Sequence, residues 1–435
     1  MDYAEITSFS LGTPATGDRN QILGAMNALA DLTGIPCNPD NAFLLPKDCA
    51  GYTEIKESIY YTKYKNYETF RTVIFELMDC FFEKHNIIPR IFITAYNLTE
   101  NKATGENVDM LCRAVKEYYK IHDLGELITA VLSSRLHKYK YVDIINIPKH
   151  LLTFRSRIRL LRNRKLKKKV LLTVGTINDF SRKNVKDKNK ILLNNLKKLS
   201  KDADLQQQIE KLENYRQKSK KVVICLGGRV EGPEIVFDVN YAKKLLTDAV
   251  NLSHVGYGVV FVNGPRTPNE VTDYLYTHTL DKPDIVFQNC KKIAQDDSER
   301  VASQWRIYSG VNEEIFRTLQ KIGNIYPGIL GFENTLVVHS ADTYACCETA
   351  NAALPTAISS NGLYIDASVR YDCLNLKSQL CPKYAIDWDE FVNIACNMGI
   401  EPNDMHPLVL SSPRRVFAEA CINRLNQIKK DRKFY

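Results

Sequence analysis

The chain has 435 residues, of which 44% are apolar and 25% are charged. These values are typical of a globular protein and exclude a disordered, collagen-like or disulfide-dense chain. A single hydrophobic core seldom grows beyond about 250–300 residues, so two domains are expected.

The formal net charge of +9 belongs to one part of the chain. Residues 151–220 contain 21 Lys and Arg and 6 Asp and Glu, so their local charge is +15 and the remainder carries −6. The chain is therefore mildly acidic with a basic middle. A local positive field of this kind suits an anionic membrane surface, a phosphorylated ligand or nucleic acid.

The 12 cysteines form no Cys-x-x-Cys pair and no Cys/His cluster with zinc spacing. Free thiols in a reducing cytosol are therefore expected, with no metal. The first residues lack a basic region followed by an apolar region, which predicts no signal peptide. No apolar run reaches about 18 residues, so no helix is expected to span a membrane. A cytoplasmic protein, with a possible peripheral membrane contact, is the expectation.

Short β-branched runs alternate with amphipathic stretches, which favours parallel sheets covered by helices. In the first half, strands are predicted at residues 6–11, 90–95, 128–132, 142–147 and 170–174. Helices are predicted at 20–32, closed by Gly34, and at 70–84 and 108–119. In the second half, strands are predicted at 222–226, 258–262, 284–287 and 336–339, and helices at 239–250, 269–279, 312–322, 341–352 and 414–430.

This pattern predicts an α/β fold with two Rossmann-like domains facing a cleft. The predicted parts are an N-terminal domain (1–185), a helical connector (186–220), a C-terminal domain (221–410) and a C-terminal helix (411–435) that packs back on the N-terminal domain. Ligands of such sheets bind outside the carboxyl ends of the strands.

Gly227, Gly228 and Arg229 follow the first strand of the second half. Glycines let a phosphate approach backbone N–H groups, and Arg229 would neutralise the phosphate. The motif is neither a Walker loop nor a dinucleotide fingerprint. A plain strand-to-helix turn is the alternative.

Arg266 follows the strand at 258–262 and stands beside the start of a predicted helix. Thr267 is predicted to cap that helix, with Pro268 at its first position and Glu270 completing a capping box. A cation is unfavourable at a helix N-terminus unless an anion lies between them. Arg266 therefore indicates an anion site, and a solvated loop arginine is the alternative.

Four polar residues follow the strand at 336–339: Ser340, Asp342, Thr343 and Glu348. Ser340 or Asp342 can cap the next helix. The first three could also face the hydroxyls or phosphates of a ligand, and Glu348 could bind a ribose hydroxyl pair. Pure capping and a surface carboxylate are the alternatives.

In the first half, a Gly-rich loop runs from Gly12 to Gln21 and could close on a substrate. His150 and His339 each stand at the end of a predicted strand, and either could act as a general base. An ordinary loop and hydrogen-bonded structural histidines are the alternatives.

Residues 151–169 form a basic amphipathic segment. Leu151, Phe154, Ile158 and Leu161 follow helical spacing among Arg155, Arg157, Arg159, Arg162, Arg164, Lys165, Lys167, Lys168 and Lys169. Such a segment can lie on an anionic bilayer or a partner surface, and each cation near a bilayer contributes about 1 kcal/mol. A solvated helix with one buried face is the alternative. Nucleic acid is disfavoured, because Phe154 is the only aromatic residue among the cations.

Several of these segments resemble the ELM (elongated-mitochondria) fission-factor family of plants and its bacterial relatives. Residues 10–21 resemble the family's opening loop, Gly-His-Glu-Asn-Gln, where Asn20 and Gln21 match and Asp18 and Arg19 depart. Residues 141–150 resemble its strand ending in Pro-Glu-His, of which His150 matches. Five further segments resemble the family: residues 169–176, 224–228, 265–268, 324–330 and 337–348. Ile325 stands where the family has a proline, and the last segment ends in Glu348.

The resemblance implies a GT-B-like, metal-independent enzyme that transfers a sugar from a nucleotide sugar to an unknown acceptor, without a cofactor. The residues expected to bind the nucleotide sugar are Gly227, Gly228, Arg229, Arg266, Thr267, Tyr326, Ser340, Asp342, Thr343 and Glu348. His150 or Asp18 would activate the acceptor hydroxyl beside an acceptor loop that contains Gly12, Gly17, Asn20 and Gln21. The alternative function is a non-enzymatic membrane-surface adaptor related to mitochondrial fission factors, which would use residues 151–169.

Overall fold

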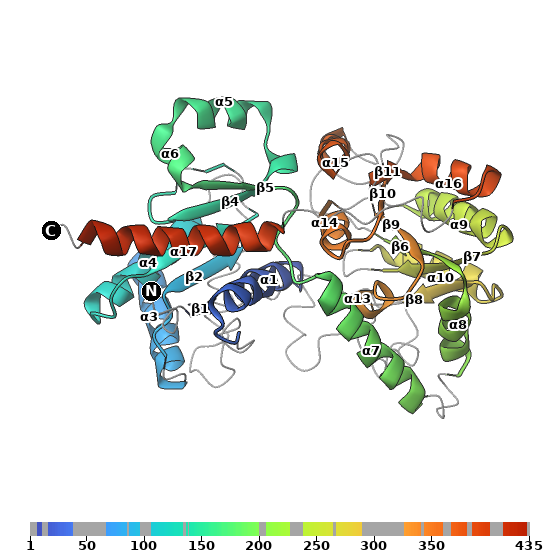
Figure 1. Cartoon of the computed structure of the whole chain (residues 1–435), viewed down its shortest axis with the longest axis horizontal. Coiled ribbons are helices and arrows are strands. Elements are labelled where there is room, and N and C mark those ends of the chain that lie inside the picture. The colour runs from blue at the N-terminus through green and yellow to red at the C-terminus, as the bar shows by residue number, and fades with distance from the viewer. Residues whose placement is uncertain are drawn as a thin grey trace. The chain divides into compact units, whose positions relative to one another are not determined.

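The structure is a computed structural model that describes residues 7–10, 16–37, 67–84, 87–95, 106–133, 136–137, 139–199, 206–226, 238–263, 267–288, 326–340, 343–359, 367–380, 385–400 and 412–432. The chain divides into two compact units. The first comprises Met1–Asp179 and Ser411–Tyr435, and the second comprises Phe180–Leu410. Figure 1 shows the helices and strands of each unit.

The first unit contains a five-stranded parallel sheet whose strands lie in chain order. The strands are β1 (Ser8–Phe9), β2 (Ile91–Ala95), β3 (Ile128–Leu132), β4 (Ile144–Pro148) and β5 (Val170–Thr173). The residues of β2, β3 and β4 are all buried, which explains why these strands read as nearly continuous apolar runs.

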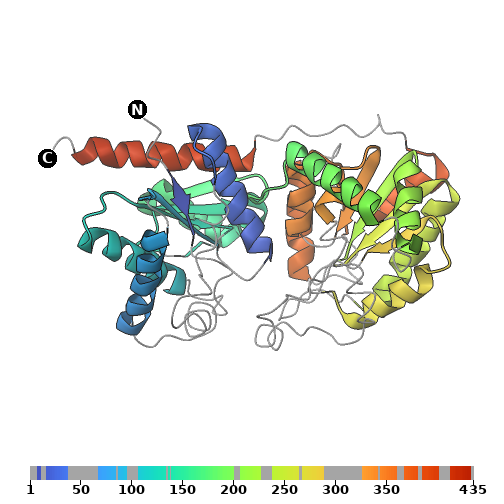
Figure 2. The same ribbon diagram turned by 90° about the horizontal axis from the view of Figure 1, so that it is seen from below.

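Helices cover both faces of the first sheet. They are α1 (Thr16–Thr33), α3 (Tyr67–Lys84), α4 (Glu106–Ile121) and α17 (Pro413–Arg432). Ile91 and Ile93 of β2 belong to a core shared with α1 and α17, whereas Phe92 belongs to a core shared with α3 and α4. Successive strand residues point to opposite faces, so one strand supplies both cores. Figure 2 shows α1 and α17 on one side of this sheet and α3 and α4 on the other.

The connection from β4 to β5 forms the basic segment. It contains a single 3₁₀ turn, η4 (Lys149–Leu151), and two short helices, α5 (Phe154–Arg162) and α6 (Arg164–Lys169). Asn163 lies between them in extended geometry, and its Oδ1 atom accepts a hydrogen bond from the backbone N–H of Leu166 at 3.0 Å. This cap starts a second helix, so the basic residues are divided between two helices.

The second unit contains a six-stranded parallel sheet in the order β11-β10-β9-β6-β7-β8. The strands are β6 (Lys220–Cys225), β7 (Tyr257–Val262), β8 (Ile285–Gln288), β9 (Thr335–Ser340), β10 (Thr356–Ile358) and β11 (Ala385–Asp387). On one side of β6 the neighbouring strands are β7 and then β8. On its other side they are β9, β10 and then β11. This is the strand order of a Rossmann fold.

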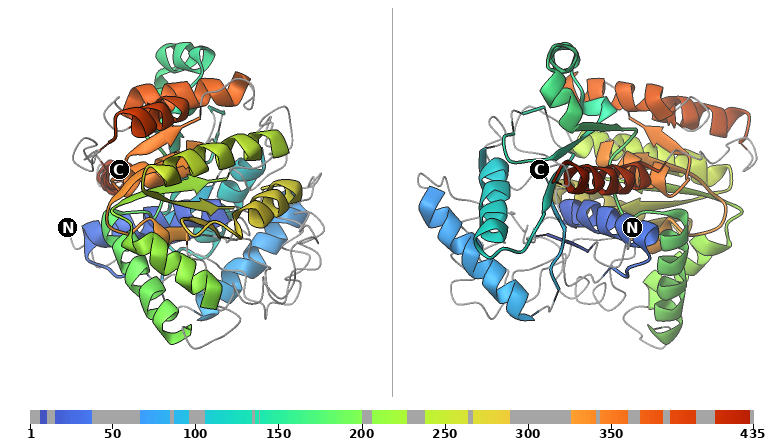
Figure 3. Two further views of the ribbon diagram at one scale, coloured as in Figure 1. Left: turned by 90° about the vertical axis from the view of Figure 1, so that its right-hand side faces the viewer. Right: turned by 60° about the vertical axis from the view of Figure 1, so that its left-hand side comes forward.

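The faces of the second sheet are covered by two groups of helices. One core includes α9 (Val239–His254), α10 (Asn269–Thr279) and α16 (Trp388–Asn397), and the other includes α7 (Arg182–Leu199), α8 (Gln206–Gln217) and α13 (Tyr326–Ile329). Two more helices are α14 (Thr343–Asn351) and α15 (Ala367–Leu380). In Figure 3 (left), α7 and α8 lie on one side of this sheet and α9 on the other.

The α/β class with two parallel, helix-covered sheets is confirmed. The segment predicted as a connector forms α7 and α8, and its residues Leu192, Leu212 and Tyr215 are buried in the second unit. The prediction of a first helix from residue 20 was wrong, because α1 begins at Thr16. It ends before Gly34, whose positive φ of 76° terminates the helix as the sequence predicted. The helix predicted at 312–322 lies outside the described residues.

Seven described cysteines form no disulfide: Cys37, Cys112, Cys225, Cys346, Cys347, Cys396 and Cys421. Cys80 forms a disulfide, so the prediction of free thiols throughout the chain was wrong at this residue. Across the part of the chain that the structure describes, no helix has both the length and the apolar character that a membrane span requires.

Candidate functional site

The second sheet reverses its strand order at β6, which lies between β7 and β9. At the carboxyl ends of these strands, Cys225 is in register with both Val262 of β7 and Ser340 of β9. In open α/β sheets, ligands bind in the crevice outside the carboxyl ends of the strands at such a reversal. The residues that follow β6 and β9 therefore flank the expected binding position of this unit.

Thr267 holds the loop after β7 against the end of β6. Its buried hydroxyl donates a hydrogen bond to the Leu226 carbonyl at 3.3 Å, and the Leu226 N–H donates to the Val262 carbonyl at 2.8 Å. The prediction that Thr267 caps the next helix was wrong. The capping position before α10 is occupied by Pro268, and no side chain caps this helix. Thr267 instead fixes the segment that immediately follows Arg266.

The end of β9 is followed closely by a helix. β9 ends at Ser340 and α14 begins at Thr343, so Ala341 and Asp342 form the whole connection. The free N–H groups at a helix N-terminus attract anions. Glu348 lies further along α14 and is half-buried.

His339 of β9 is a structural histidine. The Ala357 carbonyl lies 3.0 Å from Nδ1, so Nδ1 carries the proton, and the hydroxyl oxygen of Tyr241, which donates to Oγ of Ser359, lies 3.2 Å from Nε2. The imidazole stacks on Trp388, with ring centroids 4.3 Å apart. Burial lowers the pKa of His339 to about 3, so the ring is neutral near pH 7. Both nitrogens are occupied, which favours the structural alternative for this residue.

Several predicted site residues lie outside the described residues: Gly12, Gly227, Gly228, Arg229, Arg266 and Asp342. For Gly17, Asp18, Tyr326, Ser340 and Thr343 only the backbone is described. Gly17, Asp18, Asn20 and Gln21 belong to the first turns of α1, so the prediction that they form a loop was wrong. Their role at an acceptor site stays a prediction.

A buried polar network lies at the carboxyl edge of the first sheet. The Asn146 amide donates to the Thr173 hydroxyl at 3.0 Å, and its Oδ1 accepts from the Ser133 N–H at 3.3 Å. The Ser133 hydroxyl donates to Oε1 of Gln21 on α1. The network thus joins β3, β4, β5 and α1 at the edge where a ligand of this sheet would bind.

His150 lies directly after β4, at the same edge. Its side chain is fully buried, and within the described ranges neither ring nitrogen has a hydrogen-bond partner. Burial lowers its pKa to about 4, so the imidazole is neutral near pH 7 and one ring nitrogen is unprotonated. Buried polar atoms nearly always have partners. In the part of the chain that the structure describes, His150 is one of several buried polar side chains of this unit without a hydrogen-bond partner, and Thr94 is another.

Three members of this network were not predicted as site residues: Ser133, Asn146 and Thr173. Asn146 could have been found, because it is the single polar side chain in the apolar strand Ile144–Pro148. An amide in a buried strand requires partners, which would have indicated a network at the strand end. Among the described residues, no group of three or more His, Cys, Asp or Glu side chains is placed to hold a metal ion.

Comparison with solved structures finds likenesses over nearly the whole chain. A UDP-GlcNAc 2-epimerase from Neisseria meningitidis bound to UDP-GlcNAc has 11% identity and a TM-score of 0.44, over 98% of this chain and 99% of that chain. The UDP-N-acetylglucosamine 2-epimerase from Rickettsia bellii has 11% identity and a TM-score of 0.40, over 98% of this chain and 96% of that chain. Sucrose-phosphate synthase from Thermosynechococcus elongatus has 11% identity and a TM-score of 0.40, over 98% of this chain and 99% of that chain.

No protein-family model matches the sequence, and a search of curated proteins finds no match either. TM-scores below 0.5 do not by themselves establish a shared fold, so the class of this protein rests on its own sheet topology. The fold defines a two-unit α/β protein whose second unit has the Rossmann strand order. The resemblance to the ELM family gains no support from these comparisons.

Proposed function

We propose that the protein is an enzyme acting on a nucleotide sugar, and that it transfers the sugar to an acceptor. The observation that carries the proposal is the reversal of strand order at β6, flanked by Gly227-Gly228-Arg229 on one side and the start of α14 on the other. A diphosphate needs close backbone N–H groups and cations, and this combination of glycines, arginine and helix N-terminus supplies both.

In this proposal the diphosphate lies against Gly227, Gly228 and the N-terminus of α14, with Arg229 and Arg266 as its counter-charges. Ser340, Asp342, Thr343 and Glu348 bind the nucleoside and sugar hydroxyls, and Tyr326 shapes the pocket. The acceptor oxygen forms a bond to the anomeric carbon of the sugar as the bond from that carbon to the diphosphate breaks. The arginines and helix stabilise the charge on the leaving nucleotide. Thr267 contributes by holding the residues beside Arg266 against β6.

The acceptor would bind at the carboxyl edge of the first sheet. The neutral imidazole of His150 would accept the proton of the acceptor hydroxyl, with Asp18 as the other candidate base. The low pKa of His150 keeps a free lone pair on the ring at pH 7. Its full burial means that the ring reaches an acceptor only if the surrounding residues open. Asp18, the other candidate for the base, lies in the first turn of α1.

Calorimetric titration with UDP-GlcNAc, UDP-glucose, GDP-mannose and the free nucleotides tests the proposal. We expect the wild type to bind one nucleotide class with a Kd of millimolar or lower. Arg266→Ala should weaken that binding at least about tenfold, because it removes a charge-assisted contact to phosphate. The matched control is Arg182→Ala on α7, which removes an exposed arginine and should leave the Kd unchanged. No binding to the wild type at millimolar ligand would contradict the proposal.

Transfer is distinguished from other nucleotide-sugar chemistry by its products. With the bound nucleotide sugar and a mixture of hydroxyl acceptors, a transferase releases free nucleoside diphosphate, whereas an epimerase keeps the nucleotide attached to an altered sugar. Activity that persists in EDTA would agree with the predicted independence of metal. Release of the altered nucleotide sugar alone would show that the enzyme is not a transferase.

A further inference from the structure

The α5–α6 segment concentrates positive charge on the first unit. From Leu151 to Lys169 the chain contains five Arg, four Lys and no carboxylate. Most of these cations are exposed: Arg155, Arg157, Arg162, Arg164, Lys165, Lys167 and Lys168. The segment therefore has no acidic side chain of its own to neutralise this field.

The apolar side chains of α5 are exposed rather than packed on the unit. Phe154 is 71% exposed and Leu161 is 79% exposed, and Ile158 between them is half-buried. These three residues are spaced i, i+4 and i+7, so they share one face of the helix. In the alternative of a solvated helix with one buried face, this stripe would be the buried face, but the structure leaves it exposed. Leu160, on another face of α5, is the buried residue and packs in the core with Leu166 of α6.

Arginines flank the exposed apolar face on both sides. Arg155, Arg159 and Arg162 are also spaced i, i+4 and i+7, on the neighbouring stripe, and Arg157 lies on the opposite flank. Arg159 is held in place, because its guanidinium donates to the Leu136 carbonyl at 3.1 Å. The helix thus presents an apolar stripe between a row of three arginines and Arg157, an arrangement typical of helices that lie in a membrane interface.

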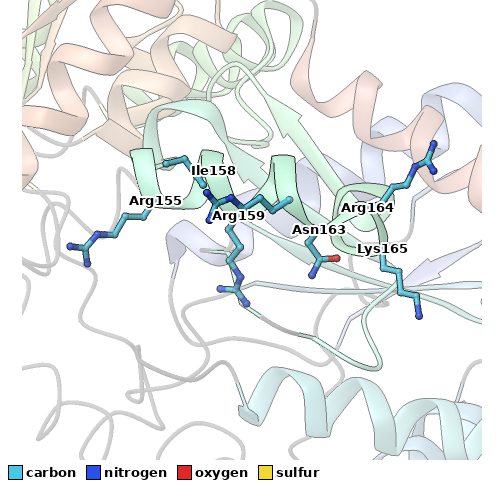
Figure 4. A pocket seen from close by; sticks show the side chains of 7 residues that line it. Arg155, Ile158, Arg159, Asn163, Arg164 and Lys165 are labelled. Atoms are coloured by element: carbon cyan, nitrogen blue, oxygen red, sulfur yellow. The ribbon is translucent and has the colours of Figure 1, made fainter.

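An open concavity of about 600 Å³ lies along α5 and α6 and is lined by Arg155, Ile158, Arg159, Arg162, Asn163, Arg164 and Lys165. Figure 4 shows Arg159, Asn163 and Lys165 extending to the same side of the two helices, with Arg164 pointing the other way. Guanidinium groups bind phosphate oxygens through paired hydrogen bonds. The concavity therefore has the chemistry of a site for phosphorylated headgroups.

We propose that α5 and α6 dock the protein on an anionic lipid bilayer. Phe154 and Leu161 enter the boundary between headgroups and acyl chains, and the flanking arginines contact lipid phosphates. The exposed aliphatic and aromatic side chains suit the apolar acyl chains of a bilayer, and the cations on both flanks suit its anionic headgroups. A nucleic acid would leave Leu161 exposed to water, and the core of a protein interface is depleted of charge. This docking is independent of the proposed nucleotide-sugar site.

Vesicle co-sedimentation of the full chain tests the docking. The vesicles are pure phosphatidylcholine, or phosphatidylcholine with about one third phosphatidylserine, at low and high salt. We expect binding only to the anionic vesicles, weakened by high salt. The triple variant Arg155→Glu, Arg157→Glu, Arg162→Glu should reduce binding by at least about tenfold. The double variant Phe154→Ser, Leu161→Ser should reduce it by about three- to tenfold while keeping its salt dependence.

Matched controls change the same kinds of residue elsewhere. The triple variant Arg182→Glu, Lys183→Glu, Lys186→Glu makes the same change in net charge on exposed residues of α7, and the double variant Ile191→Ser, Met398→Ser replaces exposed apolar residues. Both should bind like the wild type, and circular dichroism verifies that every variant is folded. Equal loss in the control triple variant, or no binding of the wild type to anionic vesicles, would overturn the proposal. Binding to oligonucleotides but not to vesicles would also overturn it.

Discussion

The hydroxyl oxygen of Tyr241 lies 3.2 Å from Nε2 of His339 and 2.9 Å from Oγ of Ser359. Tyr241 belongs to α9, His339 to β9, and Ser359 follows β10. A single buried hydroxyl thus connects a covering helix to the carboxyl ends of two strands beside the strand-order reversal.

We expect Tyr241→Phe to lower the free energy of unfolding by about 1–3 kcal/mol, because it removes a buried hydroxyl that donates to Ser359 and contacts Nε2 of His339. Urea unfolding followed by circular dichroism measures this loss. The control is Tyr274→Phe on α10, where the tyrosine is half-buried, and its effect should stay within about 0.5 kcal/mol. Equal stability of Tyr241→Phe and the wild type would show that the hydroxyl contact contributes little.

Asn146→Leu tests the polar network of the first sheet. Leucine has a similar size, but it leaves the Thr173 hydroxyl and the Ser133 N–H without the contacts that Asn146 makes. We expect a loss of about 2–4 kcal/mol in urea unfolding, since two buried groups lose a partner. Asn194→Leu, on an exposed position of α7, is the control and should have little effect. A loss no larger than that of the control would contradict the network.

Gly24→Ala tests the packing of α1, which places Gln21 at the network. A Cβ atom at Gly24 would overlap the backbone of Asn178, with Cα of Asn178 only 2.7 Å away. Helix propensity alone predicts that alanine stabilises a helix by about 1 kcal/mol. We expect the opposite sign here, a loss of about 1–3 kcal/mol, because backbone atoms must move. Thermal unfolding decides between the two signs, and a raised Tm would refute the close approach.

The stability of the first unit should depend on pH through His150. The unfolded chain binds a proton there below the ordinary pKa of 6.5, and the folded chain only below about 4. Between these values the unfolded state binds more protons, so stability falls as the pH is lowered from about 6.5 to about 4. The slope from this group approaches about 1.4 kcal/mol per pH unit.

His150→Leu should remove this contribution and flatten the dependence of the urea midpoint on pH over that interval. His254→Leu, which replaces an exposed histidine of α9, should keep the slope of the wild type. Identical slopes for the wild type and His150→Leu would mean that His150 titrates alike in the folded and unfolded chains. The same titration, read as activity, would reveal whether His150 takes part in proton transfer.

The sequence predicted the strands that are buried on both faces, because such strands form nearly continuous apolar runs. β2, β3, β7 and β9 were found in this way, and Gly34 marked the end of α1. β10 and β11 were missed, since three residues give too short an apolar run. The start of α1 was missed because glycine, threonine and aspartate at residues 16–18 are typical of a loop.

The sequence by itself determined the α/β class, the two series of strands and the basic segment, because these depend on the composition and period of neighbouring residues. Only the tertiary structure decided which strands are neighbours, and so placed the reversal of strand order at β6 between residues far apart in the chain. It also decided that Thr267 contacts Leu226, that His339 is fully bonded while His150 is not, and that Phe154 and Leu161 are exposed. Each of these features depends on whether segments far apart in the chain touch, and a local sequence pattern does not specify such contacts.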